Sequence, residues 1–443
     1  MNLVQTRISL IDQMVNEESH SVWWLAFGLV MTSATRFRIP VVPVGIGELM
    51  VFAWILANVR DVRVTSLTAG NRPTGLFAVY WAIAVVLLLA GSAIAASRNL
   101  AAADGLRSWC AFVFAGFSVS VFCAIPNLQA RARTLSIALV VCEIGVFAII
   151  YIGAEVTRDL NGSYTNWYYN EIRYAGFAEN PNQAALHLLG IPYLLATWSA
   201  ASRVFWHRLS LVPAVSVTYW MGLSTLSDAL AVSWAVGALG ALLVGLLRTS
   251  NVQKQALILI GLSFTTVCSI WHQGSLYSPI VRMFSAEVVE TRKIHPIFSR
   301  PRAALCDSTK AIEDSRDEPR KRAVRFALWQ HGLDALFTSP VLGLGPGAHS
   351  GLDKPFEAYE AHNSIIDWGT NSGFAGVLLF AALIFCLFKM AWHDRNYAGA
   401  IGILSLLMFA QFHYVFRQPI FWFYLVVFSY SGRAFCQGDD RAV

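Results

Sequence analysis

The stretch LFAVYWAIAVVLLLAGSAIAA, residues 76 to 96, contains no Asp, Glu, Lys or Arg. An α-helix needs roughly 20 mostly apolar residues to cross the hydrocarbon core of a bilayer, so this stretch predicts a transmembrane helix. Comparable windows recur along nearly the whole chain. There are about twelve of them, centred near residues 28, 49, 85, 117, 145, 192, 217, 238, 263, 382, 407 and 426.

The overall composition indicates the same class of protein. Of the 443 residues, 56% are hydrophobic and 14% are charged, and the mean hydropathy is +0.51. Soluble globular domains carry about 25% charged residues, so an ordinary soluble enzyme is excluded. We expect an all-α polytopic membrane protein with about 12 transmembrane helices and one large, partly helical periplasmic loop. Residues 1–271 should hold about nine of these helices, residues 272–361 the loop, and residues 362–443 about three more.

The basic residues predict how the chain is oriented. With both termini inside, the inner segments carry fourteen Lys and Arg, whereas the short outer loops carry the seven residues Arg36, Arg38, Arg98, Arg107, Arg158, Arg173 and Arg417. Cytoplasmic loops carry the excess of positive charge, so both termini are expected in the cytoplasm and the long loop outside. Because that loop adds twelve more basic residues, we expect an anionic partner at the outer face, and phosphate is the plausible group at a bilayer.

A first outer stretch with chemical potential is RYAGFAENPNQAALHLLG, residues 173 to 190. The Asn180-Pro181-Asn182 segment is typical of a turn that leads into a helix, which we expect to start near Gln183. The free N–H groups of that helix start can hold an anion, with Arg173 upstream. An ordinary loop and helix start is the alternative, because Asn-Pro turns are common.

The long loop contains a second stretch. DEPRKRAVRFALWQHGLDALF, residues 317 to 337, predicts a helix that begins near Pro319 and carries Arg325 and Trp329 one turn apart on one face. SPVLGLGPGAHSG, residues 339 to 351, then predicts a Gly-rich turn that permits close backbone approach. No Lys-Ser or Lys-Thr follows it, so it is not a nucleotide-binding P-loop.

The third stretch is EAYEAHNSIIDWGTNSGFAG, residues 357 to 376, in which His362 and Asn363 precede an apolar run. A neutral imidazole can take a proton from a hydroxyl, and a guanidinium such as Arg325 can hold a phosphate leaving group. Together they favour glycosyl or acyl transfer to an alcohol. A structural, hydrogen-bonded histidine is the alternative.

At these three stretches the sequence resembles the O-antigen ligase and polysaccharide polymerase family of bacterial inner-membrane glycosyltransferases. The first family element is matched by Arg173, Gly176, Asn180, Pro181 and Asn182. The second is matched by Arg325, Trp329, Pro340, Gly343, Gly345, Pro346 and Gly347. The third is matched by His362, Asn363, Gly373 and Gly376. The ordered set covers roughly residues 170 to 390.

The resemblance implies a glycan donor on undecaprenyl pyrophosphate and a periplasmic active site in the bacterial inner membrane. It implies His362 as the general base or acceptor-orienting group, Arg325 as a diphosphate contact, and no metal, cofactor or nucleotide sugar. Arg173, Asn180 and Asn182 are the other expected donor contacts. The expected partners are this donor, a glycan or lipid-linked acceptor and the lipid bilayer, with no nucleic acid.

One position departs from the family pattern. Many ligases have Ser-Arg-Gly at the outer start of a span that here begins Ser227, Asp228, Ala229. An anion in place of a phosphate-binding cation is not a conservative change. Arg173, or the loop residues Arg300 and Arg302, are the candidate replacements, and the change weakens transfer onto a lipid A core as the assigned reaction.

Direct displacement with one base would invert the anomeric centre. Asn363 and the carboxylates Glu357, Glu360 and Asp367 complete the candidate site, and the carboxylates leave a covalent intermediate open. We lean slightly toward a repeat-unit polymerase of O-antigen or exopolysaccharide, with ligation onto lipid A-core as the alternative. A transporter is the more distant alternative, because Glu143 and Asp228 are ionisable groups in or near the membrane.

Overall fold

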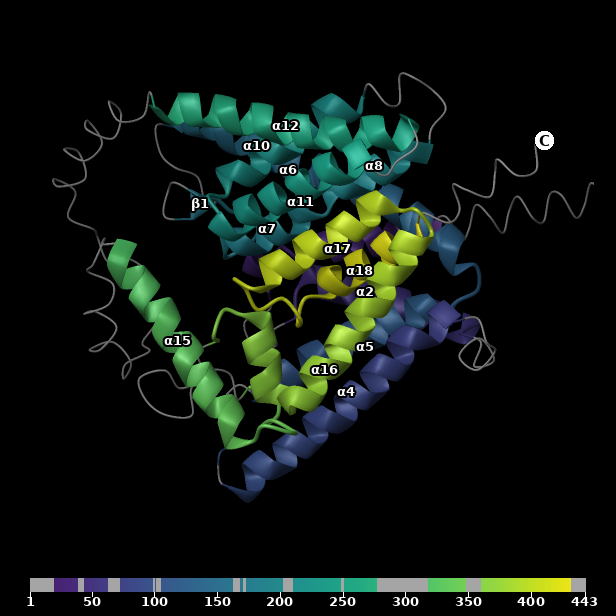
Figure 1. Cartoon of the computed structure of the whole chain (residues 1–443), viewed down its shortest axis with the longest axis vertical. Helices are drawn as coiled ribbons and strands as arrows, with labels where there is room; N and C mark the ends of the chain where they lie inside the picture. Colours follow the sequence, from purple (N-terminus) through teal and green to yellow (C-terminus); the bar gives the residue numbers. More distant parts are fainter. Residues whose placement is uncertain are drawn as a thin grey trace, which may run out of the picture.

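A computed structural model of the chain describes residues 20–38, 44–62, 72–98, 100, 105–161, 168–169, 173–201, 210–247, 251–276, 318–347 and 360–431. This part of the chain is almost entirely helical (Figure 1). Its strands are β1 (Tyr168–Tyr169) and β2 (Arg173–Tyr174), which pair antiparallel.

The helices divide into those that precede the long loop and those that lie within or after it. Before the long loop they are His20–Met31, η1 (Thr35–Phe37), α2 (Ile46–Asn58), η2 (Val59–Asp61), α4 (Arg72–Ser97), α5 (Gly105–Ala124), α6 (Leu128–Asn161), α7 (Pro181–Leu189), α8 (Ile191–Ala201), α10 (Leu211–Ser224), α11 (Asp228–Leu247) and α12 (Asn251–Leu276). From the long loop onward they are α15 (Glu318–Thr338), α16 (Ser364–His393), α17 (Tyr397–Ala410) and α18 (Pro419–Tyr430).

Six of the described helices are long and apolar enough to cross a membrane: Gly75–Ser97, Gly105–Ala124, Leu128–Ala154, Asp228–Leu247, Gln253–Trp271 and Ser364–His393. The prediction of an all-α, multi-pass membrane protein is therefore confirmed. Every predicted window centre lies within a helix, but half of them lie in helices shorter than these six. The number of spans, and the periplasmic placement of residues 272–361, stay predictions.

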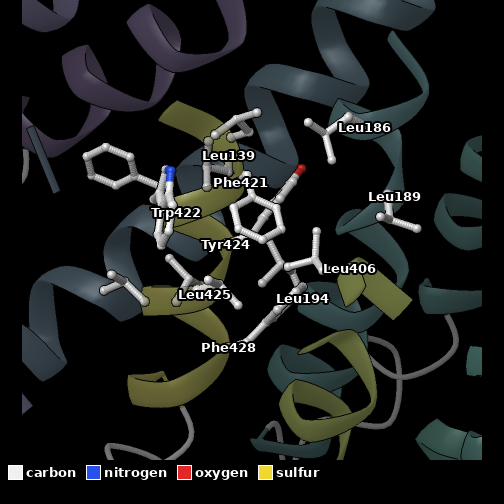
Figure 2. Close-up of a cluster of buried hydrophobic side chains, with 14 of the residues drawn as sticks. Leu139, Leu186, Leu189, Leu194, Leu406, Phe421, Trp422, Tyr424, Leu425 and Phe428 are labelled. Atoms are coloured by element: carbon white, nitrogen blue, oxygen red, sulfur yellow. The ribbon is translucent and has the colours of Figure 1, made fainter. Parts of the chain in front are cut away.

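The core of the bundle is built around α18, whose residues are all buried. It packs against α5, α6, α16 and α17. Figure 2 shows its aromatic side chains among leucines from α6, α7, α8 and α17, namely Leu139, Leu186, Leu189, Leu194 and Leu406. In a bilayer the alternative surroundings are lipid tails, so close packing rather than escape from water holds such a helix in the centre.

The connections between helices make contacts in two separate sets. In one set, Arg36 Nε donates to the carbonyl of Ala178 (2.9 Å), and Arg98 Nη1 donates to the carbonyl of Thr338 (2.8 Å). In the other set, Gln253 donates to the carbonyl of Arg395 (3.0 Å). Every segment in the first set was predicted to lie outside and every segment in the second inside, so these contacts agree with the expectation that the candidate residues share one end of the bundle.

The orientation of that end can be measured by labelling. We expect a cysteine at the exposed position Gln330 on α15 to react with an impermeant maleimide in spheroplasts. A cysteine at His393, whose side chain is 82% exposed at the other end, should react only after permeabilisation. Each cysteine should be introduced into a variant that lacks the native cysteines. The reverse pattern would place the candidate site in the cytoplasm.

Candidate functional site

His362 is carried by a turn that two neighbouring side chains hold rigid. Asn363 is the N-cap of α16, and its Oδ1 accepts from the backbone N–H groups of Ile365 (3.0 Å) and Ile366 (3.2 Å). The buried carboxylate of Asp367 accepts from the N–H groups of Ala361 (2.8 Å) and Asn363 (3.3 Å).

This double capping explains how His362 adopts a left-handed backbone, with φ 54°. Such a conformation costs a non-glycine residue about 1–3 kcal/mol and persists where the surroundings over-determine it. The His362 side chain is exposed, whereas Asn363 and Asp367 are buried. The turn therefore presents the imidazole at the surface, while Asn363 and Asp367 hold the backbone of the turn.

The connection between α17 and α18 packs against the start of α16. Asn363 Nδ2 donates to Gln411 Oε1 (3.4 Å), and Ser364 Oγ donates to the carbonyl of His413 (2.5 Å). The rings of His362 and His413 lie 6.5 Å apart between centroids. His413 and Gln411 were missed by sequence reasoning, since they follow an apolar helix without any motif.

Arg417 is a further cation that sequence reasoning counted only as a loop charge. Its guanidinium forms an ion pair with Glu360, two residues before His362. It also lies 5.0 Å from the centre of the Tyr414 ring and donates to Ser108 Oγ (3.3 Å). The carboxylate of Glu360 is thus already engaged by a cation.

The Gly-rich turn of residues 340–347 fills a break in α16. Gly373, with φ 69° and ψ −174°, interrupts the helix and leaves backbone groups on both sides without helical partners. Four backbone hydrogen bonds from the turn satisfy them: Leu344 N to Thr370 O (2.8 Å), Gly345 N to Asn371 O (3.0 Å), Phe374 N to Pro340 O (2.7 Å) and Ala375 N to Val341 O (3.3 Å). A helix break at membrane depth requires such substitute partners.

The close backbone approach predicted for this turn is therefore confirmed, and its partner is α16. A Cβ on Gly343, where φ is +70°, would lie 2.5 Å from the backbone of Asn371 and Ser372. The turn ties the end of α15 to the short helical half of α16 that begins directly after His362 and Asn363.

Arg173 and Asn182 also meet. The Arg173 guanidinium donates to the carbonyl of Thr225 (3.0 Å) and to Asn182 Oδ1 (3.2 Å). Asn180 is the N-cap of α7, and its Oδ1 accepts from the N–H of Asn182 (2.9 Å). The helix begins at Pro181, two residues before the expected start near Gln183, because Asn180 caps it and proline suits the first helical position.

A second guanidinium lies beside the same helix start. Arg36 reaches the carbonyl of Ala178, two residues before the N-cap. Burial lowers the pKa of Arg36 from its ordinary value, and Glu179 acts in the opposite direction. Two guanidinium groups and the N-terminus of α7 thus lie together with the Glu179 carboxylate, and we call this region the α7 corner. Helix N-termini favour anions. α7 packs against α17, and the C-cap residue of α17, Gln411, bonds to the His362 turn through Asn363. The corner and the turn therefore neighbour the same helix.

The remaining candidates are partly placed. Asp228 is exposed and is the first residue of α11, three residues after Thr225, where a carboxylate suits the helix dipole. Arg325 lies within α15, and its side chain is outside the described part of the chain. Arg300 and Arg302 also fall outside the described residues.

Glu143 is buried in a polar network that joins three helices. Its carboxylate meets His187 Nδ1 (3.2 Å) and accepts from the Tyr424 hydroxyl (2.6 Å). The same hydroxyl lies 2.5 Å from the carbonyl of His187, and all three side chains are buried. In Figure 2 the Tyr424 oxygen points toward the part of the core lined by Leu186. A satisfied network of this kind fixes α6, α7 and α18 relative to one another.

We expect Tyr424→Phe to lower the free energy of unfolding by about 1–3 kcal/mol, because it leaves buried acceptors unpaired. Tyr219→Phe is the matched control, since the buried Tyr219 hydroxyl has no hydrogen-bond partner among the described residues. Thermal unfolding in detergent measures both variants. Equal midpoints for the two would show that the network does not stabilise the bundle.

Within the described residues, no group of three or more His, Cys, Asp or Glu side chains could hold a metal ion. No protein-family model matches the chain, and no curated protein matches it significantly. The resemblance to the ligase and polymerase family thus rests on the motifs alone.

Proposed function

We propose that this chain is a membrane glycosyltransferase that moves an oligosaccharide from an undecaprenyl-pyrophosphate donor to a glycan hydroxyl at the periplasmic face of a bacterial inner membrane. The observations that support the proposal are the exposed His362 on its rigid turn and the two guanidinium groups, Arg173 and Arg36, at the α7 corner. A base and an anion-binding corner are the two groups that this reaction requires.

In the proposed reaction, the acceptor oxygen forms a bond to the anomeric carbon while the bond from that carbon to the diphosphate oxygen breaks. His362 takes the acceptor's proton, and the electron pair of the broken bond leaves on the diphosphate. Arg173, together with Arg325 of the long loop, neutralises the charge that develops there. Inversion at the anomeric carbon is supported by the ion pair of Glu360 with Arg417 and by the hydrogen bonds of the buried Asp367 to the backbone, which engage two carboxylates that could act as nucleophiles.

Within this class we propose a polymerase that joins lipid-linked repeat units, with ligation onto lipid A-core as the alternative. The acidic Asp228 differs from the cation of many ligases, and Arg173 reaches the carbonyl of Thr225 in the adjacent turn. Arg173 is therefore proposed to supply the positive charge at this corner.

The product of the purified protein tests the proposal. In nanodiscs that contain lipid-linked repeat units, we expect glycans of increasing length on the carrier lipid. In a deletion strain, single repeat units should remain and long chains should be lost. In the deletion strain, full-length polymer that accumulates on the carrier lipid would identify a ligase instead. Movement of glycan across a liposome membrane without bond formation would identify a transporter.

Arg173 should be sensitive to even a charge-conserving change. A lysine cannot reproduce the planar fork of a guanidinium, so we expect Arg173→Lys to lose most activity and Arg173→Ala to lose about 10²-fold or more. Arg107→Ala, an exposed cation at the same end, is the control. Donor affinity and turnover should be measured with the unfolding temperature. Unchanged donor affinity in both Arg173 variants would remove this residue from the diphosphate site.

A further inference from the structure

The exposed surface of α15 carries a narrow apolar stripe. Phe326, Leu333 and Phe337 are 61%, 39% and 63% exposed. At 3.6 residues per turn these three positions fall within about 40° of one another around the helix axis. Large apolar side chains aligned in this way on a solvent-exposed surface mark a site of contact with another apolar phase.

The other sides of α15 differ in character. One side is buried and includes Leu328, Ala335 and Leu336, and α15 packs against α16. Next to it runs the apolar stripe, and beyond the stripe come the exposed polar residues Asp334 and Thr338. Gln330 lies at the edge of the stripe, about 20° from Phe337 around the helix axis. Around its circumference, the helix therefore passes from protein contacts to apolar surface to polar surface.

The stripe continues onto a helix that crosses the membrane. The rings of Phe337 and Phe374 lie 6.3 Å apart between centroids. Phe374, Leu378 and Phe385 on the long half of α16 are 45%, 69% and 67% exposed, and they also share one helix face. Because that half of α16 belongs to a membrane-spanning helix, its exposed apolar face meets the lipid tails.

We propose that α15 lies in the boundary of the bilayer, with Phe326, Leu333 and Phe337 among lipid acyl chains and Asp334 and Thr338 among the headgroups. This is the arrangement of an interfacial amphipathic helix, which lies on a membrane with its apolar side a few ångströms below the headgroups. The occupant of the stripe is the bilayer itself, since the stripe is continuous with the lipid-facing surface of α16. In Figure 1, α15 lies at the outside of the bundle, away from the buried α18.

The consequence concerns the long loop, whose last helix lies on the membrane instead of in the periplasmic solution. Because the turn of residues 340–347 follows α15 directly and is bonded into the break of α16, the lipid surface would set the height of the turn. The inference does not depend on the proposed reaction.

Nitroxide labels on the full chain in nanodiscs test the proposal. Single cysteines at Leu333 and Phe337 should give a several-fold higher ratio of oxygen to aqueous-nickel accessibility than a cysteine at Asp334. The labelled proteins lack the native cysteines. A label at Leu378 verifies that such a protein inserts into the bilayer, because Leu378 faces lipid whether or not α15 does. Nickel accessibility at Leu333 and Phe337 equal to that at Asp334 would overturn the proposal. Protection from both reagents, with dipolar broadening between copies, would assign the stripe to a second protomer instead.

A second measurement leaves the native cysteines in place. With p-benzoylphenylalanine at Phe337, irradiation should yield an adduct with the mass of a phospholipid. The same residue introduced at Asp334 should yield none. Absence of the lipid adduct at Phe337, in protein that elutes as folded, would also contradict the placement of α15 in the bilayer.

Discussion

Replacement of His362 is expected to abolish glycan transfer while donor binding and folding persist. A positioned general base contributes about 10²–10⁴-fold to a rate, and the loss should appear in turnover rather than in donor affinity. The turn should survive, because Asn363 and Asp367 hold it through backbone groups and not through the imidazole. His362→Asn is the sharper variant, since asparagine tolerates the left-handed backbone that alanine disfavours.

The control for this experiment is His393→Ala, an exposed histidine at the other end of the bundle, which should leave activity unchanged. Turnover, donor affinity and unfolding temperature should be measured on the same preparations. Near wild-type turnover in His362→Asn would make His362 a structural residue and would remove the base from the proposed mechanism.

Gly373→Ala is expected to be a strongly disruptive single-methyl change. A Cβ at this position would collide with the backbone carbonyl of Val341 in the Gly-rich turn. The backbone combination of φ 69° and ψ −174° is also one that only glycine adopts without strain. The strain alone costs about 1–3 kcal/mol, and separation of the turn from α16 would add to it.

Gly145→Ala on α6 is the matched control, because a Cβ there meets nothing within 4 Å. In a helix this change is neutral or stabilising by about 0.5–1 kcal/mol. The unfolding temperature and the transfer activity should both fall for Gly373→Ala, and neither should fall for Gly145→Ala. If both variants unfold at the same temperature as the natural protein, the break in α16 does not depend on glycine.

Local signals in the sequence were enough to locate the helices and several of their ends. Apolar windows identified the membrane class because every backbone polar group in lipid must be satisfied within a helix. The start of α7 was predicted near Gln183, two residues after its true start at Pro181, because turn and capping signals act over only a few residues. The clustering of candidate residues at one end of the bundle is what counting helices and loops predicts.

The meeting of Glu360 with Arg417, and of Glu143 with His187 and Tyr424, could not be read from the sequence. These partners lie on different helices, and no local pattern links them. The same holds for the Gly-rich turn: its glycines predicted close backbone approach, but only the fold shows that the approaching backbone is the broken α16.

Apolar sequence by itself determined that the helices belong to a membrane, and only the tertiary structure decided which of them face lipid. α4 exposes Val79, Val86 and Leu89, whereas α18, also apolar all round, is buried along its whole length. In water, burial can be inferred from an apolar stripe, because the solvent disfavours apolar surface. In a bilayer the solvent is as apolar as the protein core, so hydrophobicity no longer distinguishes inside from outside, and packing and the few buried hydrogen bonds decide.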